Sequence, residues 1–200
     1  MMRMNRLFGS KRDVVTDEAP SARSLTDLGS PEVDPWLEEV ETALITPALL
    51  ESAGMLGFFE VWRRACRSRG RALPSRADID ILELGTYIGE LSLLEVIEGG
   101  ADFRYRVLSE GAAKLLGTDY TGKLLSETAR DAERLARLAQ RYRRVVETRV
   151  PWFSRTPAMP EMPVAYTTRL VLPLSEDGSE VSMIFVARKS GPPRRRPERN

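Results

Sequence analysis

The spacing of hydrophobic positions changes partway along this chain. Between residues 47 and 68, apolar side chains recur every three or four residues, the spacing of one face of an α-helix. The stripe comprises Leu49, Leu50, Ala53, Leu56, Phe59 and Trp62. An Asp-Pro pair at 34–35 predicts a shorter helix before it, through about Ile45. A stripe of this kind must be covered, either by its own domain or by a second subunit.

From residue 91 onward the spacing drops to two, which is the period of a β-strand. Two strands around a Gly-Gly turn are predicted at 91–97 and 102–108. Three more are predicted at 151–156, 164–174 and 180–188. The first of these three is short and flanked by proline, which indicates an irregular strand or an edge strand, whereas the last has the continuous apolar character of a central strand. Both hairpins are antiparallel, which excludes a doubly wound nucleotide-binding fold.

Helical signals separate the two groups of strands. Ser109 and Gly117 bracket a helix of two turns, and a turn follows at 119–122. Thr128 and Asp131 have the spacing of a capping box for a longer helix that reaches about Arg149. Arginines on that helix alternate with acidic residues, so we interpret its polar face as solvated and do not expect nucleic-acid binding. The predicted fold is α+β: a five-stranded antiparallel sheet with a helical block on one face, preceded by N-terminal helices.

Composition divides the chain into four stretches. Residues 1–33 mix charge, serine, proline and glycine without periodicity, which predicts a disordered leader. Residues 34–72 hold the N-terminal helices, which would serve packing or dimerisation, and residues 73–188 hold the sheet. Residues 189–200 form a basic tail that we expect to be disordered.

The 200 residues include no histidine and one cysteine, and the net charge is +1. Without histidine there is no histidine-activated nucleophile and no histidine-ligated haem, and the commonest metal ligand is missing. The single Cys66 permits no intramolecular disulfide. No apolar run is long enough to cross a bilayer and no secretory signal is recognisable, so we expect no membrane insertion and a cytoplasmic location.

Residues 73–80 read Leu-Pro-Ser-Arg-Ala-Asp-Ile-Asp, the most specific motif of the chain. Pro74 keeps the residue before it out of helical conformation. Arg76 can then bridge Asp78 or Asp80 and pin the connection to the first strand. We interpret the motif as a structural latch, with ligand binding by Arg76 or Asp80 as the alternative.

This motif follows Trp62-Arg63-Arg64, and the combination resembles an alphaproteobacterial family of stand-alone PAS-domain proteins. The resemblance extends over about 47–188 and includes the strand 103–107 (Phe-Arg-Tyr-Arg-Val), Leu116-Gly117 and the turn 121–123 (Thr-Gly-Lys). The chain departs from the family pattern at Ile81, where proline is usual, and at Ser109-Glu110, where glycine is usual. The positions that the resemblance marks as structural are Trp62, Arg76, Asp78, Asp80, Arg106 and Gly122.

The same resemblance implies a pocket between the sheet and the helical block, suited to a small apolar ligand. Its candidate lining residues are Leu94, Tyr105, Leu115, Leu116, Tyr142, Trp152, Phe153 and Phe185. Each of them also suits an ordinary core position. The cofactor stays unknown: histidine-ligated haem is excluded, and a flavin photoadduct is not expected because Cys66 precedes the domain.

No catalytic or metal-binding constellation is recognisable, so we expect a sensory or regulatory module of bacterial signalling rather than an enzyme. It would act by ligand-modulated protein–protein interaction, as a homodimer or with a signalling partner, through the helix at 47–68. The alternative is a small cone-fold α/β enzyme acting on an apolar substrate. That enzyme would need Glu95 or Asp102 buried beside Tyr105 or Tyr166.

Overall fold

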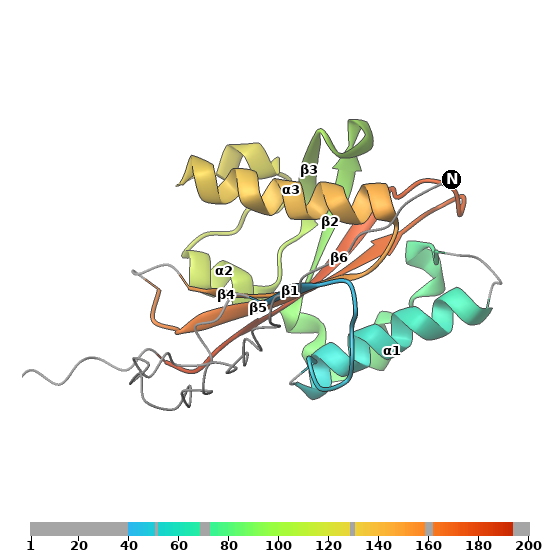
Figure 1. Cartoon of the computed structure of the whole chain (residues 1–200), viewed down its shortest axis with the longest axis horizontal. Coiled ribbons are helices and arrows are strands. Elements are labelled where there is room, and N and C mark those ends of the chain that lie inside the picture. The colour runs from blue at the N-terminus through green and yellow to red at the C-terminus, as the bar shows by residue number, and fades with distance from the viewer. Residues whose placement is uncertain (1–39, 51, 69–72, 129–130, 159–161, 194–200) are drawn as a thin grey trace, which may run out of the picture. The chain divides into compact units, whose positions relative to one another are not determined.

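The computed structural model describes residues 40–50, 52–68, 73–128, 131–158 and 162–193 (Figure 1). The expected leader, the start of the helix expected from residue 34 and the end of the basic tail lie outside these residues.

One antiparallel sheet of six strands organises the described residues. The strands are β1 (Val40–Thr42), β2 (Leu91–Ile97), β3 (Asp102–Val107), β4 (Trp152–Pro157), β5 (Tyr166–Leu174) and β6 (Met183–Ser190). Their spatial order is β1-β4-β5-β6-β2-β3. All five predicted strands are present and β6 is central, so the predicted α+β class with an antiparallel sheet is confirmed.

The sixth strand, β1, corrects the prediction of a helix through Ile45. Residues 40–42 pair with Arg155, Ser154 and Phe153 of β4. The β-branched side chains of Val40 and Thr42 favour extended backbone. Strand β4 pairs in regular register with β1 on one side and with β5 on the other, so the prediction that it is irregular or at an edge is also wrong.

Within the described ranges, three α-helices and four 3₁₀ segments accompany the sheet. They are α1 (Ala53–Ser68), η2 (Arg76–Asp78), η3 (Ile81–Glu90), η4 (Glu98–Gly100), α2 (Glu110–Leu116), η5 (Leu125–Thr128) and α3 (Ala132–Thr148). As predicted, Ser109 caps α2 and Gly117 ends it in the left-handed conformation.

Two helix starts differ from the predictions, each because another polar side chain acts as the cap. The helix predicted from residue 47 begins at Ala53, where the Ser52 hydroxyl accepts a hydrogen bond from the Met55 N–H at 3.1 Å. The Asp131 carboxylate caps α3 by accepting from the Arg134 N–H at 3.0 Å. The expected cap, Thr128, instead donates its hydroxyl to the Leu125 carbonyl at 2.7 Å.

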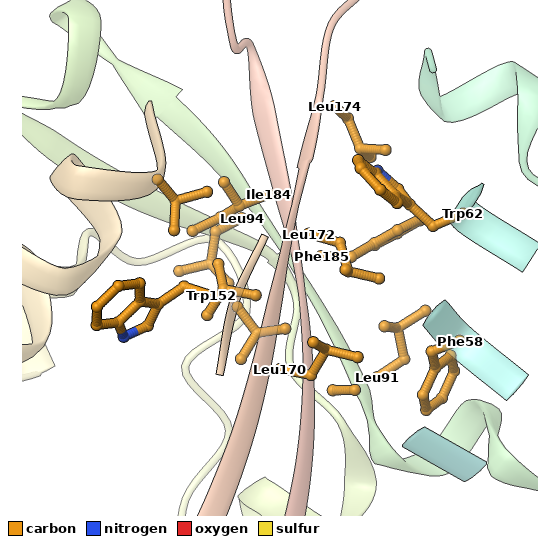
Figure 2. Packing of buried hydrophobic residues seen from close by; sticks show 14 of the residues in the cluster. Phe58, Trp62, Leu91, Leu94, Trp152, Leu170, Leu172, Leu174, Ile184 and Phe185 are labelled. Carbon is orange, nitrogen blue, oxygen red and sulfur yellow. The ribbon is translucent and has the colours of Figure 1, made fainter. Parts of the chain in front are cut away.

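Apolar side chains cover both faces of the sheet, and different helices pack on each (Figures 1 and 2). Figure 2 shows Phe58 and Trp62 of α1 on the side of Leu172 and Phe185, with Leu94 and Ile184 on the other side. The indole N–H of Trp62 donates to the Pro173 carbonyl of β5 at 2.8 Å.

The buried face of α1 is formed by Met55, Phe58, Val61, Trp62 and Ala65. Of the predicted stripe, Leu50 and Trp62 are buried, whereas Leu56 and Phe59 are half-buried and Ala53 is exposed. Association through this helix stays a prediction.

The 73–80 motif connects α1 to the sheet, but without the expected ion pair. The Asp78 carboxylate accepts from the backbone N–H and hydroxyl of Ser75, both at 2.9 Å, and the Asp80 carboxylate accepts from the Leu82 N–H at 2.9 Å. Both carboxylates thus cap the short helices η2 and η3. The Arg76 guanidinium instead donates to the Ile79 carbonyl at 3.2 Å and lies 5.9 Å from the centre of the Phe185 ring.

At the other end, the sheet continues past the expected domain boundary. Strand β6 runs to Ser190, so Lys189 belongs to the sheet rather than to the tail, and it pairs with Thr168 of β5. Pro193 forms a further isolated bridge with Val164. The start of the tail was placed too early because a basic residue in a strand resembles the basic residues that follow it.

Candidate functional site: a cavity between the sheet and helices α2 and α3

A cavity of about 130 Å³ lies between the sheet and the helices α2 and α3. Its apolar lining residues are Leu94, Leu108, Ala112, Leu116, Leu125, Leu135, Leu138, Met162 and Val186. Its polar and aromatic lining residues are Ser92, Tyr105, Tyr120, Thr128, Asp131, Arg134, Tyr142, Arg169 and Arg188. The site therefore combines an apolar wall with a cluster of arginines and phenols.

Four predicted pocket residues line this cavity: Leu94 and Tyr105 of the sheet, Leu116 of α2 and Tyr142 of α3. Leu94 and Tyr105 are register partners on β2 and β3, so their side chains share one face of the sheet. Tyr142 is 3% exposed, and its ring meets Phe103 edge to face with 5.3 Å between ring centroids.

The other four predicted residues lie outside the cavity. Side chains alternate along a strand, and this places Phe153 and Phe185 on the face that α1 covers. Trp152 lies under α3, with its ring centre 4.4 Å from the Arg144 guanidinium carbon. Leu115 precedes Leu116, so it points about 100° away around α2 and is only half-buried.

A glycine turn positions Tyr105 from outside the sheet. The Gly122 N–H donates to the Tyr105 carbonyl at 2.7 Å, and the Tyr105 N–H donates to the Lys123 carbonyl at 3.0 Å. Gly122 has a φ of 87°, a conformation that favours glycine. The turn covers the outer edge of β3. Arg106, the next residue after Tyr105, has a side chain that is 55% exposed on the opposite face of β3.

Arg169 and Arg188 form the part of the site that the sequence prediction missed. They are register partners on the neighbouring strands β5 and β6, and both line the cavity. The alternation of side chains along each strand could have identified them. Arg169 is two residues from Val171, and Arg188 is two residues from Val186, so each arginine lies on the same face as its valine. Those two valines are register partners on the same face.

Burial perturbs the titration of the polar cluster. It lowers the pKa of Arg188 to about 9, and the neighbouring positive charge of Arg169 acts in the same direction. Burial also lowers the pKa of Arg169. The same desolvation raises the pKa of Tyr105 and of Tyr142 above that of an exposed phenol. At neutral pH, Arg188 is therefore charged and lies in a cavity that also holds neutral phenols.

The two arginines differ in their hydrogen bonding. Arg169 donates to the hydroxyls of Thr167 and Thr156, at 3.2 and 3.4 Å. The Nε atom of Arg188 is buried and lacks a hydrogen-bond acceptor in the part of the chain that the structure describes. Buried polar groups in folded proteins nearly always have a partner. The Nε–H of Arg188 is therefore a free donor at the cavity, which water or a ligand can satisfy.

The alternative enzyme was predicted to use Glu95 or Asp102 beside Tyr105 or Tyr166, and the structure places these two carboxylates in other interactions. Glu95 lies 3.7 Å from Arg104 and 3.8 Å from Arg106, on the face of β2 opposite Leu94. Asp102 accepts hydrogen bonds from the Phe103 N–H at 2.7 Å and the Ser126 hydroxyl at 2.6 Å. Neither carboxylate is among the described residues that line the cavity.

Cys66 also lies away from this cavity. It is half-buried on α1, which packs against the opposite face of the sheet. Burial raises the pKa of its thiol to about 11, so the thiol is protonated at neutral pH. Among the described residues, His, Cys, Asp and Glu side chains form no cluster of three or more that could hold a metal ion.

A family model described as PAS domain matches residues 50–186. The match covers more than half of the chain, so the chain belongs to the PAS domain family. PAS domains are in general sensory or regulatory modules of signal transduction. Comparisons with curated proteins and with solved structures gave no match. No helix in the described ranges combines the length and apolarity that a membrane span requires.

Proposed function

We propose that this protein is a sensory or regulatory module of bacterial signalling, without catalytic activity, that acts through protein–protein contacts. The occupant of the cavity modulates those contacts. The observation that carries the proposal is the cavity itself: in a PAS domain, apolar and charged side chains converge between the sheet and a thin helical cover. The cytoplasmic location expected from the sequence stays a prediction.

Helix α2 is the part of the cover that would respond to an occupant. It spans Glu110–Leu116, and Ala112 is its buried residue. Short helices with little buried surface have low local stability. A molecule that fills the space between Leu116 and the sheet would therefore change the position or the mobility of α2.

Helix α2 contacts η3, which offers a surface for association. Leu82 is 83% exposed, Ile88 is 43% exposed and Tyr87 is 39% exposed on this segment. Exposed apolar side chains gathered on one segment are typical of interaction sites. We propose that the η3 surface, defined as Leu82, Tyr87 and Ile88, binds a second copy of the chain or a signalling partner.

Native mass spectrometry of the full chain, followed by light scattering, tests this function. We expect a small molecule to co-purify, and its removal to shift the monomer–dimer equilibrium or the binding of a signalling partner. The double substitution Leu82→Asp with Ile88→Asp should abolish association. Leu44→Asp is the matched control, because Leu44 is 82% exposed but lies outside the η3 surface. A chain that stays monomeric, binds no partner and responds to no cavity occupant would contradict the proposal.

A further inference from the structure

We propose that the cavity binds a small organic anion whose carboxylate or phosphate group lies against Arg169 and Arg188 and whose apolar part lies among the leucines and tyrosines. This inference rests on the proposed function only in that it treats the cavity as a ligand site. It adds the chemical class of the ligand.

The charges around the cavity favour an anion. The described residues that line it carry three guanidinium groups, on Arg134, Arg169 and Arg188, against the single carboxylate of Asp131. That carboxylate caps α3, and the Arg134 guanidinium donates to the Pro157 carbonyl at 3.2 Å. In the described part of the chain, neither Arg169 nor Arg188 forms an ion pair with a carboxylate.

The placement of the two arginines makes an empty cavity unfavourable. They stand directly opposite each other on neighbouring antiparallel strands, where like charges repel. Burial increases this repulsion, because less water screens it. An oxyanion beside both guanidinium groups would compensate the repulsion between them. It would also accept a hydrogen bond from the Nε–H of Arg188, which has no acceptor among the described residues. Guanidinium groups bind carboxylate and phosphate oxygens in pairs, so the geometry of the side chain suits the ligand.

The rest of the cavity sets the size and character of the ligand. Leu94, Leu116 and Leu135 line it together with the neutral phenol of Tyr105. Its volume is about 130 Å³. Apolar cavities of about 150 Å³ in other proteins accommodate benzene. The apolar part of the ligand is therefore about the size of one aromatic ring or a short aliphatic chain.

A neighbouring groove provides a path for an anion. Arg137 and Arg141 line it together with Arg134 and Arg169, and the last two residues line the cavity as well. No carboxylate is among the described residues that line this groove. Arg137 is paired with Glu133, but the guanidinium groups that line the groove still give it positive charge, which raises the local concentration of anions.

Isothermal titration of the full chain with matched probes tests the inference. Benzoate and phenyl phosphate carry the anionic group on an aromatic ring; benzyl alcohol is the neutral analogue, and inorganic phosphate lacks the apolar part. We expect saturable binding of at least one aromatic anion, at least about tenfold tighter than the alcohol and than inorganic phosphate. Tighter binding of benzoate would identify a carboxylate ligand, and tighter binding of phenyl phosphate a phosphate ligand.

Substitutions test the arginine pair and the apolar part of the cavity separately. Arg188→Met and Arg169→Met should each weaken anion binding at least about tenfold. The control Arg106→Met changes another strand arginine, on the opposite face of the sheet, and should leave the affinity unchanged. Leu116→Trp fills the apolar part without touching the charges, so it should abolish binding even if an arginine variant fails to fold.

Three results would overturn the inference: no saturable binding of either aromatic anion, equal affinity for benzyl alcohol, or unchanged affinity in folded Arg188→Met. Failure of the inference can be distinguished from failure of the proposed function. If a neutral molecule co-purifies and controls association, the proposed function holds and the proposal of an anionic ligand is wrong. If an anion binds tightly but changes no protein contact, the anionic ligand is supported and the proposed function is wrong.

Discussion

The face of the sheet that α1 covers and the face that α2 and α3 cover use buried side chains differently. On the α1 face, Phe58, Trp62 and Phe185 pack closely, and the polar N–H of Trp62 reaches a backbone carbonyl. On the other face, Leu94 and Tyr142 border a cavity whose charged wall holds an unsatisfied N–H group.

This difference indicates a division between stability and function. Close apolar packing contributes to the free energy of folding. Like charges held close together away from water lower that free energy. Substitutions on the two faces should therefore change different properties.

We expect the largest change in the free energy of unfolding from a substitution on the α1 face. Trp62→Ala removes a buried ring and its hydrogen bond to Pro173, and should reduce the free energy of unfolding by about 3–5 kcal/mol. Urea denaturation followed by circular dichroism measures this change. Trp62→Phe keeps most of the packing, so its free energy of unfolding should fall much less than that of Trp62→Ala. An equally small loss in both variants would show that α1 is not packed as described.

A substitution on the cavity face should change the free energy of unfolding by a smaller amount and in the opposite direction. Arg188→Met removes one of two opposed, half-buried charges and should raise the free energy of unfolding of the ligand-free protein by about 1 kcal/mol. Arg106→Met, at an exposed position, should stay within about 0.5 kcal/mol of the natural chain. A clear loss of stability in Arg188→Met would mean that the charge is compensated within the protein.

The pH dependence sharpens this prediction. The pKa of Arg188 is about 9 in the folded protein, below its value in the unfolded chain, so the unfavourable charge is fully present below pH 9. As the pH rises above 9, the folded protein releases this proton first and the natural chain gains stability. The difference between the natural chain and Arg188→Met should therefore shrink between pH 8 and about pH 10. A constant difference would contradict the assignment of the charge to Arg188.

The smallest expected effect concerns the carboxylate at the cavity. Asp131→Asn preserves the cap of α3, because asparagine caps helices as well as aspartate, but removes the negative charge. The affinity for benzoate or phenyl phosphate should rise about two- to fivefold. Glu133→Gln is the matched control: Glu133 pairs with Arg137 on the surface of α3 and is not among the residues that line the cavity. Equal changes in affinity in the two variants would show that the overall surface charge, and not the Asp131 carboxylate at the cavity, determines the affinity.

The sequence was sufficient to predict the sheet because β3 alternates apolar and polar residues, and β5 and β6 are runs of apolar and β-branched residues bounded by turn signals. Strand β1 was missed because Val-Glu-Thr is too short to show any period, and the Asp-Pro signal before it favoured a helix. The start of α1 was misplaced because Pro47 suits a first helical turn, whereas the cap is formed by Ser52.

The site was predicted only in part, for two physical reasons. A shift of one position along a strand moves a side chain to the other face, which is why Phe185 was assigned to the cavity while Val186 lines it. An arginine in a sequence is usually exposed, so the sequence alone does not indicate Arg169 and Arg188 as cavity residues. Only the pairing of β5 with β6 brings them together.

Thermal unfolding of the natural chain and of Arg188→Met, each with and without a saturating aromatic anion, tests the central claim most directly. Without ligand, Arg188→Met should unfold at the higher temperature because one opposed charge is gone. With benzoate or phenyl phosphate, the natural chain should unfold at the higher temperature, because only its cavity binds the anion tightly. If the order of the two unfolding temperatures is the same in both conditions, the arginine pair is not an anion site.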